Sequence, residues 1–228
     1  MCGRFTLTTP AVELERRFLV DLQGRHVPRY NVAPGQEVLA VVAAGGARRP
    51  ARLRWGLIPP WSDDPRPGPI NARAETAARR PMFRQAMRRR RCLIPADGFY
   101  EWMRRGKARL PVLFRLRDGS PFALAGIYER WEGSDGPVWT CCVLTTRPNP
   151  LVGQVHDRMP VILRPEWEAA WLDADIPPEE LAAAWEPYPA SAMVAYPVSP
   201  RVNSPRHDDP GCVMPVGPPL PSPGGEAD

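Results

Sequence analysis

The residues best suited to covalent chemistry stand at the start of the chain, which reads Met1-Cys2-Gly3-Arg4-Phe5. Aminopeptidases that remove an initiator methionine generally accept a second residue as small as Cys2. Removal of Met1 would leave an α-amine and a thiol on adjacent carbons, and this pair can condense with an aldehyde to an imine and close to a thiazolidine. The ordinary pKa values, about 7.7–8.0 for the amine and about 8.5 for the thiol, leave a reactive fraction of each near neutral pH. We expect the positive charge of Arg4 to favour the thiolate; the alternative is that Cys2 simply begins a disordered terminus.

Two further side chains could move protons. Glu101 lies between Tyr100 and Trp102 in a strand-like segment, and a carboxyl among aromatic rings is disfavoured as an anion, which makes it a candidate proton donor. The alternative is an exposed glutamate on a half-buried sheet. His156 stands before the apolar segment 159–163 and is suited to proton transfer near pH 7, with Asp157 or another acceptor to orient it. A lone histidine can equally be structural.

Polar and aromatic residues in two loops could contact a ligand. Asn71 and Arg73 would point to the same side of an extended segment, where they could hold a phosphate and a polar reacting atom. Trp55 and Trp61 flank a proline-stiffened loop. They either pack inward or offer a stacking surface for bases.

The basic residues are nearly all arginine. Only Lys107 among the thirty is lysine, the net charge is +5 and the isoelectric point is about 9.2, which favours a nucleic-acid partner. Lys107 is also the only side-chain amine that could form an imine. Segment 79–91 holds seven arginines, of which Arg80, Arg84, Arg88 and Arg91 have helical spacing. Their common face is either a solvated surface or a phosphate-tracking stripe.

The remaining elements must position these residues within one domain, as the 228 residues indicate. The sequence contains no run of about 18 apolar residues, so we expect no membrane span. It also has no positively charged start followed by an apolar segment, so we expect no secretory signal. Five cysteines without a C-x-x-C pair favour neither a disulfide framework nor a zinc site, and fit a reducing cytoplasm. Thr9-Pro10 predicts the N-cap and first residue of a helix over 11–20. Further helices are expected at 165–172 and 177–185, and strands at 37–43, 52–57, 92–102 (broken by an Asp-Gly turn), 112–117, 122–128, 138–146 and 192–198.

Seven segments together resemble the SOS-response-associated peptidase family, also called abasic-site processing proteins. They appear in the family's order and span residues 1–216. The segments are MCGRF at 1–5, RYNVAPG at 29–35, WGLIPPW at 55–61, INARAET at 70–76, CLIPADGFYEW at 92–102, HDRMPVIL at 156–163 and VSPRVNS at 198–204.

The resemblance implies a single mixed α+β domain over residues 1–216, with a barrel-like, largely antiparallel β core surrounded by helices. The Pro/Gly-rich residues 217–228 are expected to form a disordered tail. The implied partner is single-stranded DNA that contains abasic sites, also in the context of a replication fork. The implied activity is a covalent thiazolidine crosslink to the open aldehyde. We expect a cytoplasmic monomer that joins the nucleoid on DNA damage and needs neither a cofactor nor a metal.

By motif position, the resemblance assigns Cys2 as the nucleophile and Asn71, Glu101 and His156 as its catalytic companions. One departure from the family is Ser62, where some members carry a second aromatic residue after the loop tryptophan, so base-wedging by this loop is in doubt. The residues implied on the DNA side are Arg4, Asn31, Pro34, Trp61, Arg73, Trp102, Thr145 and Arg158.

Two other functions stay open at this stage. A cysteine peptidase would use the Cys2 thiolate with His156 as base and Glu101 or Asn71 as its orienting group, with Met1 as the obvious leaving residue. A non-catalytic single-strand DNA-binding module would need only the arginines and tryptophans. Weak lyase activity would follow if the imine stage eliminated the 3′ phosphate.

Overall fold

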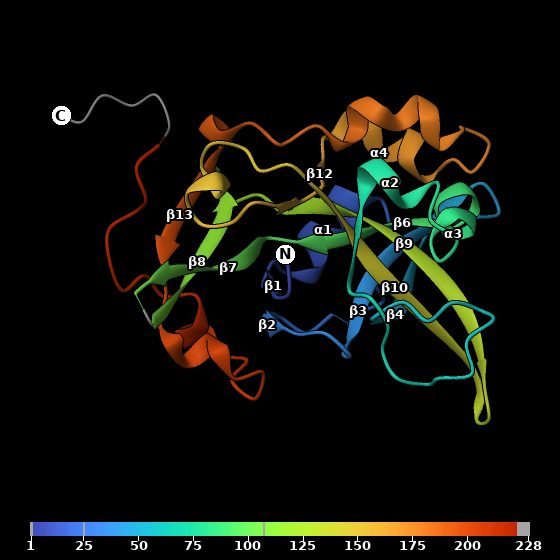
Figure 1. Cartoon of the computed structure of the whole chain (residues 1–228), viewed down its shortest axis with the longest axis horizontal. Coiled ribbons are helices and arrows are strands. Elements are labelled where there is room, and N and C mark those ends of the chain that lie inside the picture. Colours follow the sequence, from blue (N-terminus) through green and yellow to red (C-terminus); the bar gives the residue numbers. More distant parts are fainter. Residues whose placement is uncertain (1, 25, 107, 223–228) are drawn as a thin grey trace.

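The computed structural model describes residues 2–24, 26–106 and 108–222. Met1 and Lys107, on which two sequence hypotheses depend, lie outside these residues, as do residues 223–228 of the predicted tail. The strands form two sheets with helices packed around them, which confirms the α+β prediction. Figure 1 shows strands β7, β8 and β13 on the left and the barrel strands on the right.

The strands range from two-residue bridges to a hairpin of two long strands. They are β1 (Phe5–Leu7), β2 (Arg29–Val32), β3 (Glu37–Ala44), β4 (Ala47–Trp55), β5 (Asn71–Arg73), β6 (Arg91–Ala96), β7 (Gly98–Arg105), β8 (Ala108–Leu116), β9 (Phe122–Gly133), β10 (Gly136–Thr146), β11 (Met159–Pro160), β12 (Ile162–Leu163) and β13 (Met193–Pro197).

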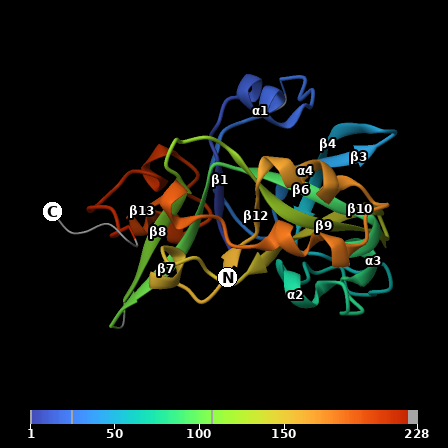
Figure 2. The same ribbon diagram turned by 90° about the horizontal axis from the view of Figure 1, so that it is seen from above.

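The helices are short. The α-helices are α1 (Ala11–Phe18), α2 (Ala74–Ala77), α3 (Arg84–Arg89) and α4 (Pro165–Leu172), and the 3₁₀ turns are η1 (Val152–Gln154), η2 (Pro178–Trp185), η3 (Ala190–Ala192), η4 (Pro200–Asn203) and η5 (Pro210–Cys212). Viewed from above, α1 lies on one side of the barrel and α2 and α3 lie on the other (Figure 2).

Five strands close the predicted barrel. Strands β4, β3, β6 and β9 pair in that order, all antiparallel. Strand β10 then pairs antiparallel with β9 on one side and parallel with β4 on the other, so the five strands form a closed ring whose edges are all paired. The parallel contact is short and joins Thr140 to Arg54 and Cys141 to Trp55.

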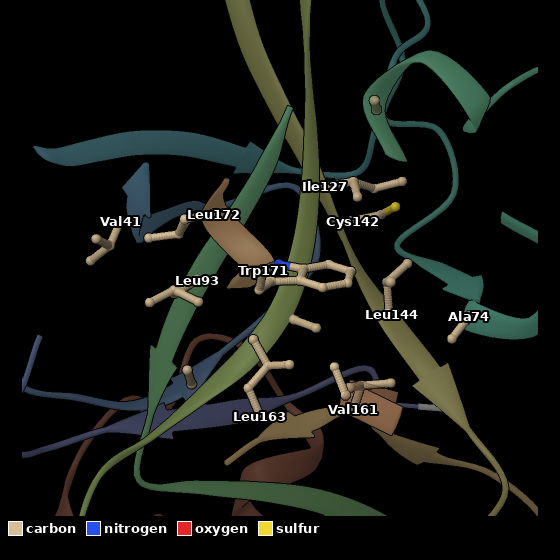
Figure 3. Close-up of a cluster of buried hydrophobic side chains, with 14 of the residues drawn as sticks. Val41, Ala74, Leu93, Ile127, Cys142, Leu144, Val161, Leu163, Trp171 and Leu172 are labelled. Carbon is tan, nitrogen blue, oxygen red and sulfur yellow. The ribbon is translucent and has the colours of Figure 1, made fainter. Parts of the chain in front are cut away.

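Both faces of the barrel wall carry buried side chains, and successive side chains of a strand point to opposite faces. Thus Cys141 and Cys142, which are neighbours in sequence, belong to two different apolar clusters. The cluster under the helices is centred on Trp171 of α4 (Figure 3), whose Nε1 donates a hydrogen bond to the carbonyl oxygen of Cys92 at 3.0 Å. The pair Cys141–Cys142 therefore forms core, as predicted, rather than a redox centre.

The second sheet carries the start of the chain. Its order is β13-β8-β7-β1-β2, all antiparallel. Phe5 pairs with Phe99, and the backbone N–H of Tyr100 donates to the carbonyl oxygen of Arg4 at 3.0 Å. This pairing brings Cys2 to the edge of β7, where Glu101 lies.

Two local predictions are wrong. Thr9 is not the N-cap of α1: Pro10 occupies that position, and the Thr9 hydroxyl donates instead to the carboxylate of Asp97 at 2.9 Å. Arg91 does not join a basic face. It begins β6 after α3 has ended, is 3% exposed, and donates to backbone carbonyl oxygens that include those of Trp171 and Asp173.

Residues 217–222, the first part of the predicted tail, lie against β13. The backbone N–H of Leu220 donates to the carbonyl oxygen of Ala195 at 2.8 Å, and Arg117 donates to the hydroxyl of Ser222 at 3.2 Å. None of the helices in the described ranges is both long enough and apolar enough to cross a membrane.

Candidate active site

A buried carboxylate fixes the segment that follows Cys2. Asp97, at the turn between β6 and β7, is 1% exposed and accepts hydrogen bonds from Thr6, Thr8 and Thr9. Its Oδ2 accepts hydrogen bonds from the backbone N–H and the hydroxyl of both Thr8 and Thr9, at 2.5–2.9 Å. From the sequence, Asp97 was expected only to form a turn. The three threonines close behind Cys2 are the signal that could have pointed to an acceptor.

Cys2 is fully buried and is held by a side chain from the barrel. The Asn71 Nδ2 donates to the carbonyl oxygen of Cys2 at 2.9 Å, and the Cys2 Sγ lies 3.9 Å from the carbonyl oxygen of Arg4. Asn71 itself is fixed because β5 pairs with β10, Asn71 opposite Val143. Its Oδ1 is buried and accepts no hydrogen bond from the part of the chain that the structure describes. The amide therefore has an acceptor available for a ligand.

Glu101 is buried, which excludes the exposed alternative. It is 3% exposed, and burial raises the pKa of its carboxyl, although the nearby His156 opposes the shift. Burial and the charge of Glu101 together raise the pKa of the Cys2 thiol well above its usual range. The expected role of Arg4 in favouring the thiolate is therefore wrong, since its guanidinium donates to Asn31 and to backbone carbonyl oxygens of residues 202 and 203, and burial raises the pKa of the thiol.

His156 faces the same cavity as Glu101. The cavity has a volume of about 460 Å³, and Trp102 also contributes to its lining. The backbone N–H of Arg158 donates to Nδ1 of His156 at 3.0 Å, and the carboxylate of Asp157 lies 2.9 Å from the same nitrogen. A neutral ring can thus accept from Arg158 while keeping its proton on Nε2, and a protonated ring can donate to Asp157. Both protonation states have a partner, as a proton shuttle requires.

Arg4 and Asn31 join the start of the chain to the loop around η4. The Arg4 guanidinium donates to Asn31 Oδ1 at 2.8 Å and to the carbonyl oxygens of Val202 and Asn203 at 2.6 and 3.2 Å. Asn31 is fully buried and also donates to three carbonyl oxygens of residues 202–207. In the same loop, Asn203 Oδ1 accepts from Trp102 Nε1 at 2.7 Å. Asn31 therefore positions Arg4 and the loop, and its contact with DNA stays a prediction.

Arg158 is held in a similar way. It makes a bidentate ion pair with Glu75 at 2.8 and 2.9 Å and donates to the carbonyl oxygen of Thr145 at 2.6 Å. Partial burial acts against ionisation of Glu75, yet its bonds to Arg158 and the charge of Arg73 hold the pKa of its carboxyl below the usual value. Thr145 is buried and supports Arg158, so its direct contact with DNA also stays a prediction. Glu75 was missed in the sequence, where nothing in INARAET marks it as the partner of a distant arginine.

The other residues expected on the DNA side are exposed. Pro34 and Arg73 lie on the surface, and Trp61 is 68% exposed whereas Trp55 is fully buried. Trp55 thus packs inward, and Trp61 keeps an exposed ring that is available for stacking. Trp61, Asn71 and Arg73 line a second cavity of about 520 Å³ that extends toward Met82 and Phe83. Asn71 therefore touches Cys2 on one side and an apolar, basic-edged groove on the other.

Comparisons with known proteins agree with this arrangement. A sequence model of the family described as SOS response associated peptidase (SRAP) matches residues 1–205. The abasic site processing protein YoqW of Bacillus subtilis is 45% identical over 218 residues, covering 92% of this chain and 97% of that protein. The abasic site processing protein YedK of Escherichia coli is 31% identical over 230 residues, covering 95% and 100%.

A solved structure supports the same relationship. The crystal structure of a protein from Bacteroides thetaiotaomicron superimposes with a TM-score of 0.84 at 25% sequence identity, covering 94% of this chain and 100% of that chain. The match spans both sheets rather than one motif. The chain therefore belongs to the SOS response associated peptidase (SRAP) family.

Proposed function

We propose that this protein recognises abasic sites in single-stranded DNA and links covalently to them through Cys2 once Met1 has been removed. The observation that carries the proposal is the hydrogen bond from Asn71 to the Cys2 carbonyl, because it fixes the reactive residue beside a buried carboxyl and a histidine. The relatives named as abasic site processing proteins support the choice of substrate.

The first step is opening of the sugar and attack by the amine. An abasic site exists mainly as a closed sugar, and Glu101, whose raised pKa keeps its proton closer to neutral pH, donates that proton to the ring oxygen. The Cys2 amine then adds to the freed aldehyde carbon, and the carbinolamine loses water to give an imine. His156 carries the protons, and the free Oδ1 of Asn71 orients the amine or the carbinolamine hydroxyl. Confinement converts a bimolecular reaction into a unimolecular one.

The second step closes the ring. The Cys2 sulfur bonds to the imine carbon, its proton is lost to the neighbouring base, and the imine nitrogen gains a proton. The sum is amine, thiol and aldehyde giving a thiazolidine and one water, with no change of oxidation state. Burial raises the pKa of the Cys2 thiol, which favours the amine as the first nucleophile, with the sulfur acting after the imine has formed.

Among the arginines expected to meet phosphate, we assign direct contact to Arg73, which is exposed, and a framing role to Arg4 and Arg158. Trp61 offers a base a stacking surface of the kind single-strand binders use. We place the protein as a monomer in the cytoplasm, joining the nucleoid on DNA damage and acting at replication forks, where a free N-terminal cysteine stays reduced. Residues 1–216 form the working domain in this proposal.

A cysteine peptidase that removes Met1 by thiolate attack is less well supported. Such an enzyme needs a depressed thiol pKa, and burial here does the opposite. Weak lyase activity from the imine stage is compatible with the same groups.

The test is a denaturing gel of the protein with an oligonucleotide that bears one abasic site. We expect a covalent band without borohydride trapping. Cys2→Ala should abolish it, and Cys2→Ser, which keeps the amine but replaces the thiol, should give at most a labile product. A band that survives Cys2→Ala, or binding without any band, would contradict the proposal; in the latter case the protein is a non-covalent DNA-binding module.

A further inference from the structure

Two arginines face each other across the hairpin of β7 and β8. Arg104 and Arg109 are register partners in this antiparallel pair, so their Cβ atoms are about 5 Å apart. Both are exposed, and neither guanidinium makes a hydrogen bond or ion pair with any other residue in the described ranges. Like charges directly opposite each other destabilise a strand pair. An external anion between them would remove that cost.

Four exposed arginines elsewhere in the chain show a different arrangement, because each is paired with a carboxylate. These pairs are Arg66–Asp64, Arg130–Glu132, Arg147–Glu186 and Arg201–Asp209. Arg104 and Arg109 have a second cation as their cross-strand neighbour instead.

Arg104 and Arg109 are among the residues that line the same cavity as Glu101 and His156. Its volume, about 460 Å³, is in the range of sites for small ligands. Arg105, the next residue of β7, is not among the described residues that line it. The cavity thus connects the candidate catalytic groups with one specific pair of cations.

The charges within the cavity decide which part of a nucleotide can lie where. Glu101 is buried in the cavity lining, and the exposed carboxylate of Asp157 lies beside His156. The Asp157 carboxylate would repel a phosphate placed next to His156, whereas it would not repel an uncharged sugar. The exposed rim carries the two arginines, whose planar donor groups suit phosphate oxygens.

We propose that Arg104 and Arg109 form a binding site for the phosphodiester next to the lesion, on the side of the strand that leaves the catalytic cavity past His156. This inference deepens the proposed function and rests on it for the position of the abasic sugar. It assigns a rim site for one flanking nucleotide that is separate from the groove lined by Trp61 and Arg73.

The first test measures binding without covalent chemistry. An oligonucleotide with a tetrahydrofuran abasic analogue has no aldehyde, so its affinity reports non-covalent binding alone, whether or not Cys2 reacts. We expect Arg104→Gln and Arg109→Gln each to weaken binding about tenfold. The slope of log affinity against log salt should fall by about 0.7 in each variant, because one phosphate is no longer neutralised. The matched control is Arg105→Gln, which removes the same charge from the adjacent position and should change affinity by less than about twofold. Equal losses of affinity in all three variants, or no loss, would overturn the proposal.

The second test separates folding from binding. Arg109→Glu places opposite charges across the strand pair, so its thermal midpoint should be no lower than that of the wild type while its DNA affinity falls. A variant that binds as tightly as the wild type would overturn the site.

The third test locates the phosphate. Oligonucleotides that end directly at the lesion on the 5′ or on the 3′ side should differ in how much affinity they lose on the Arg104→Gln substitution. The Arg104→Gln effect should vanish with one of them and persist with the other. An effect that persists with both would contradict a flanking phosphodiester. Failure of the covalent step alone would leave these affinities unchanged, which distinguishes the two proposals.

Discussion

The amide nitrogen of Asn71 donates a hydrogen bond to the carbonyl oxygen of Cys2 across 2.9 Å. The two residues are far apart in sequence: Asn71 begins β5, which pairs with the barrel, whereas Cys2 precedes β1 of the second sheet. The contact therefore fixes the start of the chain against the barrel wall. It leaves the other end of the same amide, Oδ1, buried and available to a substrate.

Asn71→Asp should slow formation of the covalent adduct by about tenfold to a hundredfold. The aspartate carboxylate cannot donate to the Cys2 carbonyl and would place two acceptors against each other. Single-turnover adduct rates at saturating DNA measure the effect. Affinity for the tetrahydrofuran analogue serves as the control and should change much less. A variant that loses affinity but keeps its adduct rate would show that Asn71 binds DNA rather than positioning Cys2.

Asp97→Asn should lower the free energy of unfolding by about 2–4 kcal/mol. The amide that replaces one carboxylate oxygen cannot accept from the backbone and hydroxyl donors of Thr8 and Thr9, and those buried donors would lose their partner. Urea denaturation gives the value. Because the same donors hold the segment behind Cys2, the adduct rate should also fall under conditions where the variant is fully folded. An Asp97→Asn protein with wild-type stability would refute the stabilising role of the hydrogen bonds from Thr8 and Thr9 to Asp97.

Glu101→Gln should stabilise the protein at neutral pH while reducing adduct formation. The folded-state pKa of Glu101 is raised by burial, so the folded protein binds its proton more tightly than the unfolded chain does. Stability is thus lost as pH rises from the ordinary glutamate pKa, about 4.3, through the folded-state pKa. Glutamine removes this cost, and the difference between variant and wild type should disappear below about pH 4. Thermal midpoints at both ends of this range provide the measurement; a glutamine variant that is less stable at every pH would contradict the assigned burial penalty.

Trp61→Ala should weaken single-stranded DNA binding by about 1–3 kcal/mol with little effect on folding. The side chain is 68% exposed, so its removal should change the free energy of unfolding by no more than about 0.5 kcal/mol, whereas a bound base would lose its aromatic stacking partner. The control is Trp139→Ala, which removes another exposed tryptophan, one that packs on Tyr128 in the β9–β10 hairpin. Equal effects of the two substitutions on affinity would argue against a specific role for Trp61.

The sequence was sufficient for the elements whose signals are local. Pro165 is the first residue of α4 as predicted, and the strand predicted at 37–43 is observed as β3. The vicinal amine and thiol of a processed Cys2 are evident from its position alone. The burial of Glu101 did not follow from the sequence, because an exposed glutamate on a half-buried sheet fits the same residues and the neighbours Tyr100 and Trp102 point to the opposite face of β7.

The parts that could not be predicted depend on long-range partners. Thr9 is of a residue type that often forms an N-cap, yet its hydroxyl donates a hydrogen bond to the carboxylate of Asp97, 88 positions away. Arg91 continues a helical spacing, yet the helix ends before it and the carbonyls of α4 and its following turn bury its guanidinium. Trp55 and Trp61 are indistinguishable as residue types, and only the register of β4 decides which one is buried.

The most direct measurement is the intact mass of the complex formed with an oligonucleotide that carries a single abasic site. We expect a species that survives denaturation without reduction. Its mass should equal the protein without Met1 plus the oligonucleotide minus one water, and peptide mapping should place the link at Cys2. An adduct that retains Met1, or one whose link maps to Lys107, would contradict a thiazolidine formed by the processed N-terminal cysteine.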